Sequence, residues 1–245
     1  AYNESDGLNP YFAKSDENLY ICDLMYEPLY QLDSAYSVTG VIAESIHIMD
    51  NVATVRLRQG ISCRGSSDVN AEDVVYSFNA YMLEENKSPK RDYLNSFIES
   101  CEAIDDRTVE FVFRKPMPEF RAYPVLSFKI IPSRFQNQDM DVNMRDGELE
   151  RRFATEPIGT GPYKLASWEI GKWLTFKANG LYFKTVPKVD SIVVKRIIDP
   201  VVRNNELKKG RVNLVLETNP MDRDKVAKMS KVDINSYMPY AFYNV

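Results

Sequence analysis

Two stretches of alternating residues, on either side of a capped helix, constrain the fold of this chain most strongly. Apolar and polar side chains alternate over residues 52–58 and again over residues 107–113, and this period of two predicts half-buried strands. Between them, Asn70 and Asp73 stand three positions apart before an apolar-periodic segment, which is the spacing of a helix capping box. The middle of the chain is therefore expected to form an antiparallel sheet that carries a helix.

Two further elements follow from the same kind of pattern. Ser15 or Asp16 is expected to cap a helix that runs to about Tyr30, because apolar side chains recur there at steps of three and four. Residues 163–168 and 172–178 flank a short turn that contains glycine, and they predict a β-hairpin.

Strands and helices alternate in the last third of the chain. The expected elements are a strand over 191–198, a helix over 201–209, a strand over 212–216 and a helix from Asn219 to about Met229. Such alternation favours right-handed βαβ units and therefore a mostly parallel sheet. The predicted class is mixed α/β, with residues 136–156 as a polar connection between the antiparallel and parallel parts.

Composition excludes several classes of function. The 245 residues carry 31 Lys and Arg against 35 Asp and Glu, and this net charge of −4 argues against a nucleic-acid or anionic membrane surface partner. The single histidine, His47, excludes metal sites built on two histidines and leaves one imidazole for acid–base catalysis. No apolar run approaches the ~18–20 residues of a membrane span. The sequence thus predicts no catalytic residue, no metal ligand and no cofactor.

The three cysteines are expected to be structural. Cys22 falls on the apolar face of the first predicted helix and reads as a small core residue. Cys63 and Cys101 could form a disulfide if their Cα atoms lie within about 7 Å, but the odd count leaves at least one free thiol.

Other polar motifs are expected to have structural roles. Neighbouring carboxylates at 84–85, 105–106 and 222/224 point apart on a strand or helix, so they predict solvated side chains or caps rather than a facing catalytic pair. The Gly-x-Gly at 159–161 precedes a strand rather than a helix, which indicates a turn and not a phosphate-binding loop.

The predicted topology indicates one place where a ligand could bind. Leu216 and Glu217 follow a predicted strand and precede a predicted helix, and open parallel sheets bind ligands at the carboxyl ends of their strands. Two interpretations remain open: these residues line a cleft, or Asn219 caps its helix while Glu217 is solvated.

Six short motifs, in this order along the chain, resemble those of the family 5 extracellular solute-binding proteins, which serve peptide, nickel and related ABC importers. The motifs are Leu8-Asn9-Pro10, Tyr26-Glu27-Pro28-Leu29, Val41-Ile42-Ala43-Glu44-Ser45, residues 54–60 (TVRLRQG), residues 70–77 (NAEDVVYS) and residues 158–165 (IGTGPYKL). The loop at 63–68 departs from the family pattern, because it has no Gly and no Pro at the positions where the pattern has them.

The resemblance implies a periplasmic-binding-protein-like type II lobe with an inserted subdomain. Residues 1–31 and 156–245 would form the first lobe, residues 32–155 the inserted antiparallel α+β subdomain, and the chain would end at the interlobe hinge near 242–245, without the second lobe. The implied function is capture of an extracellular solute, foremost an oligopeptide or dipeptide, for delivery to an ABC permease. The implied protein is a monomer that is extracellular, periplasmic or a cell-surface lipoprotein, with its export signal outside this chain.

The resemblance also implies which residues meet the solute. They are Lys14, Ser15 and Asp16 in the early loop, Leu216 and Glu217 at the strand end, and Tyr237 and Phe242 in the aromatic hinge strand. Two other functions remain as alternatives: a cleft hydrolase or glycosidase that uses a carboxylate pair, and an adhesion or scaffold module that keeps the fold without transport.

Overall fold

The computed structural model describes residues 8–33, 35, 37–63, 68–133, 157–216 and 220–235. Within them, the strands form a two-stranded sheet of order β1-β2, a four-stranded sheet of order β3-β4-β6-β5 and a three-stranded sheet of order β7-β8-β9. The elements in chain order are α1 (Asp16–Met25), β1 (Tyr30–Leu32), β2 (Val38–Gly40), β3 (Ala43–Met49), β4 (Val52–Leu57), α2 (Ala71–Met82), η2 (Glu84–Asn86), α3 (Arg91–Phe97), β5 (Ile98–Asp105), β6 (Thr108–Phe113), α4 (Glu119–Val125), β7 (Tyr163–Glu169), β8 (Trp173–Ala178), β9 (Ser191–Lys195), α7 (Pro200–Lys208), η3 (Pro220–Asp222) and α8 (Arg223–Ala227).

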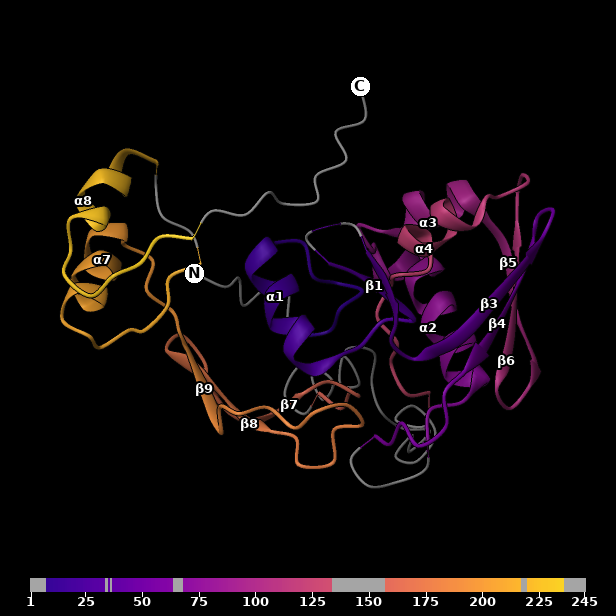
Figure 1. The fold of residues 1–245 in the computed structure, drawn as a ribbon, viewed down its shortest axis with the longest axis horizontal. Coiled ribbons are helices and arrows are strands. Elements are labelled where there is room, and N and C mark those ends of the chain that lie inside the picture. Colours follow the sequence, from indigo (N-terminus) through magenta and orange to yellow (C-terminus); the bar gives the residue numbers. More distant parts are fainter. Residues whose placement is uncertain are drawn as a thin grey trace.

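The four-stranded antiparallel sheet confirms the two strands predicted from alternation. β4 pairs antiparallel with β3 on one side and with β6 on the other, and Val55 lies opposite Ile46 and Val109. Ala53 and Leu57, on the same face of β4, are fully buried. α2, α3 and α4 lie beside this sheet and close its apolar face (Figure 1).

The predicted capping box at the start of α2 is present. The Asn70 side chain accepts a hydrogen bond from the Asp73 backbone N–H at 3.1 Å, and the Asp73 carboxylate accepts one from the Asn70 N–H at 3.1 Å. Asp73 is fully buried, and its other oxygen accepts from the Ser133 N–H at 2.7 Å and from the Ser133 hydroxyl at 2.8 Å. One carboxylate therefore caps the helix and also fixes the strand-like segment that returns past it.

α1 begins where it was predicted but ends a turn earlier. Ser15 is the N-cap, whereas the last helical residue is Met25, and Tyr26 is already extended with φ −128° and ψ 139°. Pro28 explains the stop, because proline lacks an N–H and disfavours helical geometry in the residue before it. The segment after α1 instead pairs with other backbone, including a bridge between Pro28 and Lys129.

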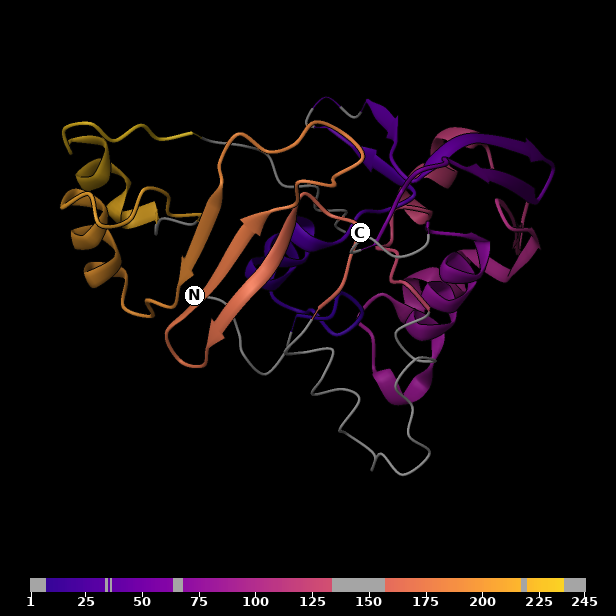
Figure 2. The same ribbon diagram turned by 90° about the horizontal axis from the view of Figure 1, so that it is seen from below.

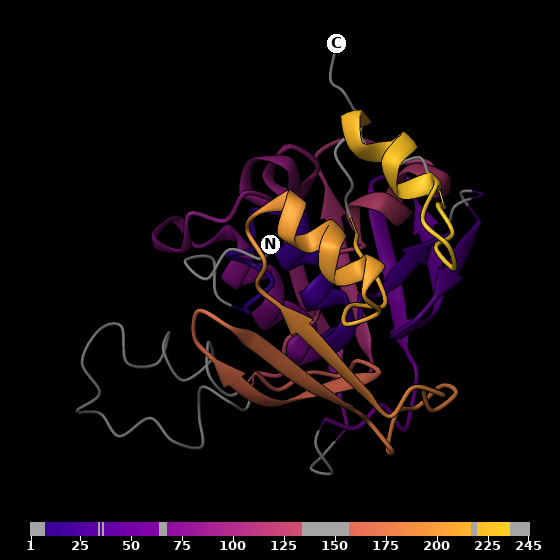
Figure 3. The same ribbon diagram turned by 90° about the vertical axis from the view of Figure 1, so that its left-hand side faces the viewer.

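The predicted hairpin forms β7 and β8, and β9 extends it. The turn between β7 and β8 contains Gly171 at φ +82°, a conformation that favours glycine. The three strands lie along one side of α1 (Figure 2). α7 and α8 lie at the end of the molecule away from the four-stranded sheet (Figure 1), and they lie in front of the rest of the chain in Figure 3.

The expectation of a mostly parallel sheet is wrong for the described residues. β9 pairs antiparallel with β8, and every other strand pair that the structure describes is antiparallel as well. The predicted strand over 212–216 does not form, and Leu214 and Leu216 are 72% and 47% exposed. A parallel strand needs a neighbouring sheet edge, and within the described chain residues 212–216 pair with none.

Of the two helices of this region, the first forms one residue earlier than predicted and the second is shorter than predicted. α7 starts at Pro200 under an Asp199 cap and stops before Gly210, whose φ of +68° is left-handed, as the pattern indicated. The last helix is a 3₁₀ turn followed by α8, and the predicted cap Asn219 lies outside the described residues.

The Gly159–Gly161 turn packs directly on the C-terminal end of α1. The Gly161 N–H donates to the Met25 carbonyl at 2.8 Å. A Cβ atom on Gly159 would lie 2.0 Å from that same oxygen, and one on Gly161 would lie 2.4 Å from the Met25 carbonyl carbon. The turn interpretation is confirmed, and close approach of two backbones explains both glycines.

The three cysteines are free thiols and all are buried. A Cys63–Cys101 disulfide is therefore absent, and Cys22 is the core residue that its position predicted. Burial raises the pKa of the Cys22 thiol to about 12 and also raises the pKa of Cys101. Because the thiolate is the reactive form, these side chains are inert in the folded state.

We expect native protein to resist alkylation. Without reductant, iodoacetamide should add to none of the three thiols of the folded chain and to all three after denaturation, as read by intact mass. An adduct count of one in denaturant would reveal a disulfide and contradict the free thiols.

We also expect the Gly159 contact to dominate the stability of the α1 junction. Gly159→Ala should lower the free energy of unfolding by about 2 kcal/mol or more, because its Cβ would overlap the Met25 backbone. Gly180→Ala is the matched control, since a Cβ there meets no atom within 4 Å. Urea unfolding of both variants measures the difference, and an equal effect would contradict the close contact.

Candidate functional site

The early loop predicted to meet solute leads into α1. The Ser15 hydroxyl accepts a hydrogen bond from the Asn18 N–H at 3.3 Å and donates to the Asn18 side chain at 3.0 Å, so this serine has a capping role. Lys14 and Asp16, on either side of it, are exposed. The structure therefore brings these three residues together at one helix end, with two charged side chains facing solvent.

The other predicted residues lie elsewhere or outside the described chain. Leu216 is 47% exposed and belongs to the segment between α7 and η3, which lies beside those helices and apart from α1 (Figures 1 and 3). Glu217, Tyr237 and Phe242 fall outside the residues that the structure describes. No strand forms between α7 and η3 in the described residues, so the prediction that Leu216 lies at the end of a strand is not supported.

Glu27 is a buried carboxylate directly after α1 that the sequence reasoning did not single out as functional. Its backbone N–H donates to the Thr160 hydroxyl at 3.2 Å, and its carbonyl accepts from the Ile130 N–H at 3.0 Å. Its side chain is 6% exposed, accepts a hydrogen bond from the Tyr182 hydroxyl and lies 3.7 Å from Lys184 Nζ. The residue thus joins three segments of the chain through separate atoms.

The contacts of Glu27 keep Tyr182 protonated. Burial, followed by the hydrogen bond and the negative charge of Glu27, raises the pKa of Tyr182 above its usual range. The phenol of Tyr182 is therefore the hydrogen-bond donor in the link between the end of α1 and the loop after β8. This is a structural role and not that of a general acid.

A pair of lysines lies beside α1, and the sequence reasoning missed it as well. Lys129 Nζ lies 2.6 Å from the Asp23 carboxylate. Lys90 is half-buried, and burial, followed by the nearby charge of Lys129, lowers its pKa. Asp23 therefore pairs with Lys129, and Lys90 adds a second basic group nearby.

The carboxylates that were considered for catalysis have local roles. Asp105 accepts from the Arg107 N–H at 2.7 Å and from the Thr108 hydroxyl at 2.9 Å, and these hydrogen bonds lower its pKa. Glu84 lies 3.8 Å from Arg91, and Asp222 lies 3.3 Å from Lys225. Each accepts from or pairs with a neighbour of its own segment, as the prediction of caps and solvated side chains implied.

The part of the chain that the structure describes holds no cluster of three or more His, Cys, Asp and Glu that could bind a metal ion. Among the same residues, no helix is both long and apolar enough to cross a membrane.

Comparison with known proteins identifies the family. The model of bacterial extracellular solute-binding proteins, family 5 Middle, matches residues 37–245. The oligopeptide-binding protein AppA of Bacillus subtilis is 25% identical over 84% of this chain and 38% of its own length. The di/tripeptide-binding protein 2 of Pseudomonas aeruginosa is 29% identical over 83% of this chain and 42% of its own length.

The fold agrees with this assignment. The crystal structure of NikZ from Campylobacter jejuni in complex with Ni(L-His) superposes with a TM-score of 0.70 and 27% identity, over 84% of this chain and 40% of that one. The mixed α/β class and the periplasmic-binding-protein-like type II lobe are therefore confirmed, and the chain spans about two fifths of the length of the curated relatives above. The chain belongs to the bacterial extracellular solute-binding proteins of family 5.

Proposed function

We propose that the protein to which this chain belongs is the substrate-binding component of an ABC importer. It would capture an extracellular solute between two lobes and deliver it to a membrane permease, without chemistry of its own. The observation that carries the proposal is the family match over residues 37–245, which includes both the four-stranded and the three-stranded sheet.

The proposed division of the chain assigns residues 1–31 and 156–245 to the first lobe and residues 32–155 to an inserted subdomain. The contacts of Gly161 with Met25 and of Thr160 with Glu27 support it, because they join the two proposed parts of the lobe across the insertion. The four-stranded sheet, with its own helices, forms within the insertion. The lobe would end at a hinge near 242–245, with a second lobe supplied by further chain.

A peptide is the proposed solute, because two relatives named above are oligopeptide-binding and di/tripeptide-binding proteins. An extended peptide satisfies its backbone groups on strand edges, while the shape of the pocket sets selectivity. A metal complex is the second candidate, given the Ni(L-His) complex of the Campylobacter protein.

The proposed solute-facing residues on this lobe are Lys14, Ser15, Asp16, Leu216, Glu217, Tyr237 and Phe242. Exposed Lys14 and Asp16 at the start of α1 are the members best supported by the structure. Lys129, which pairs with Asp23, and the nearby Lys90 extend the proposal to a second place where a carboxylate of the solute would bind.

The proposed partners and location follow from the family. An extracellular solute-binding protein would act outside the cytoplasmic membrane, free in the periplasm or extracellular space or anchored there as a lipoprotein, and would meet ABC permease subunits as a monomer. A hydrolase that uses Asp16 and Glu217, and an adhesion module, are the competing functions. Turnover of a peptide would favour the first, and a gene neighbourhood without a permease and ATPase would favour the second.

Calorimetric titration of the full-length protein with di- to nonapeptides tests the proposal. Saturable binding without peptide cleavage is the expected result, since the site would release its solute unchanged. Cleaved products, or no binding of any peptide or of Ni(L-His), would contradict the proposed function.

Substitutions at the α1 start test the proposed surface. Lys14→Ala and Asp16→Asn should each weaken peptide affinity by about threefold to tenfold, the usual effect of losing a single hydrogen bond. Lys115→Ala, an exposed lysine of the four-stranded part, is the matched control and should leave affinity unchanged. If all three variants bind peptide as tightly as the unsubstituted protein, the start of α1 is not part of the solute site.

A further inference from the structure

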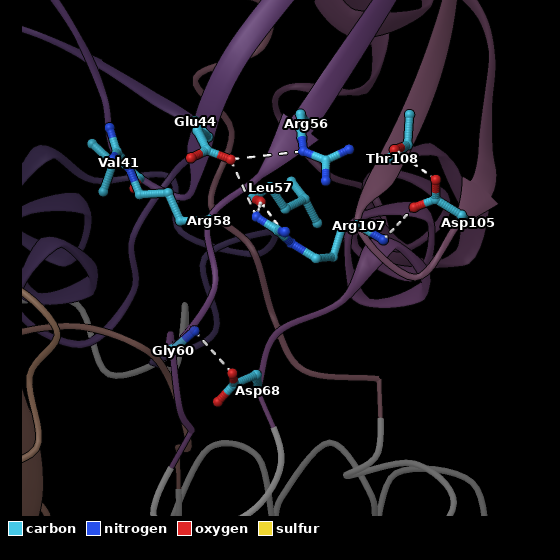
Figure 4. Close-up of polar contacts among 10 residues, drawn as sticks. All are labelled: Val41, Glu44, Arg56, Leu57, Arg58, Gly60, Asp68, Asp105, Arg107 and Thr108. Atoms are coloured by element: carbon cyan, nitrogen blue, oxygen red, sulfur yellow. Dashed lines mark hydrogen bonds and ion pairs between the residues drawn. The ribbon is translucent and has the colours of Figure 1, made fainter.

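A hollow of about 830 Å³ opens where the four-stranded part meets the loop after β8, and basic side chains line it. Arg56 and Arg58 come from the end of β4, Arg107 comes from the turn between β5 and β6, and Lys184 comes from the loop. Arg56 and Arg107 both pair with the Glu44 carboxylate, whereas the Arg58 side chain runs toward Val41 (Figure 4).

Backbone carbonyls hold two of these guanidinium groups in place. Arg58 donates through Nε to the Val41 carbonyl at 3.0 Å and through Nη2 to the Gly40 carbonyl at 3.2 Å. Arg107 donates through Nε and Nη2 to the Leu57 carbonyl at 3.1 and 2.6 Å. A carbonyl fixes a guanidinium without neutralising it, so both positive charges are pre-oriented and retained.

The hollow carries a surplus of positive charge. Glu44 is the single carboxylate among the lining residues, and it is shared, at 3.2 Å from Arg107 Nη2 and 3.8 Å from Arg56 Nε. Four cationic side chains against one carboxylate leave a net lining charge of +3, in a chain whose total charge is −4. Arg58 has no carboxylate partner among the ion pairs of the described residues.

Three further carboxylates contact lining residues without lining the hollow themselves. Asp105 accepts from the Arg107 N–H and the Thr108 hydroxyl, and Asp68 accepts from the Gly60 N–H at 2.9 Å. Glu27, which lies 3.7 Å from Lys184, is buried behind the loop. With Lys184 paired to Glu27, the three arginines against Glu44 leave a net charge of +2 in the hollow, which an entering anion would offset.

We propose that this hollow binds a small multivalent oxyanion, such as a phosphate compound or a polycarboxylate. The planar guanidinium fork matches two oxygens of such a group, and the Nη1 group of Arg58 and of Arg107 donates to no acceptor among the described residues. The volume suits a small molecule. The lining residues differ from those proposed to face the transported solute, so the anion would occupy a separate site.

An anion bound in the hollow would also affect the stability of the fold. A multivalent oxyanion held by Arg58 and Arg107 on one side and by Lys184 on the other would connect the four-stranded part to the loop after β8. Bound anion would therefore stabilise the native chain against unfolding by an amount that grows with the logarithm of its concentration over its dissociation constant.

Calorimetric titration of the full chain with pyrophosphate, and separately with citrate, tests the proposal. Saturable binding of one or both is expected, weakened by added salt as Coulombic attraction requires, with acetate as the monovalent control. Binding of pyrophosphate alone would identify a phosphate site, and binding of citrate alone a polycarboxylate site.

Variants locate the binding. Arg58→Gln and Lys184→Gln should each weaken pyrophosphate affinity by about tenfold, the value of one charge-assisted hydrogen bond. Arg114→Gln is the matched control, because Arg114 also holds a backbone carbonyl, that of Asn95, but does not line the hollow. If Arg58→Gln fails to fold, the pyrophosphate affinity of Lys184→Gln still tests the proposal.

The results that overturn the proposal are distinct from those that would overturn solute transport. Absence of binding by either multivalent anion, an equal loss of affinity in Arg114→Gln, or binding of a hexaglutamate peptide in their place would refute the oxyanion site. Peptide affinity should be the same with and without saturating pyrophosphate, and competition between the two would show that the anion occupies the solute site.

Discussion

The structure depends on one close backbone contact, in which the turn at 159–161 approaches the last carbonyl groups of α1. Because two glycines bring backbone against backbone, the Gly161 N–H reaches the Met25 carbonyl at 2.8 Å and Thr160 comes within hydrogen-bonding distance of Glu27. Residues 133 positions apart in sequence are thereby joined. The Glu27 carbonyl then accepts from Ile130, so the four-stranded part is attached to the same short segment.

Elements whose signals are local could be predicted from the sequence. The capping pair Asn70 and Asp73 fixes the start of α2 within four residues of chain, and strict alternation fixes β4 and β6. β5 escaped prediction for a physical reason, because two bulges along it shift the register and break the period of two. The pairing direction of β9 was predicted wrongly, since a strand pattern does not specify which edge the strand meets.

The candidate sites show the same limit. Ser15 was predicted correctly at the helix start because capping is local. Glu27 and Tyr182 are 155 positions apart, and the sequence around either residue does not predict its contact with the other. Arg56, Arg58 and Arg107 each read as an ordinary solvated side chain, and only the folding of two hairpins places them around one hollow. Where function rests on residues from distant segments, spacing along the chain carries little of the information.

The three buried thiols have a consequence for the life of this protein before it is folded. A protein that acts outside the cytoplasm meets an oxidising environment, where an accessible thiol is converted to a disulfide or to a sulfenic acid. In the native chain, Cys22, Cys63 and Cys101 are shielded by packing alone. For a protein with the proposed location, the interval between export and core formation would therefore be the one in which these thiols are open to oxidation.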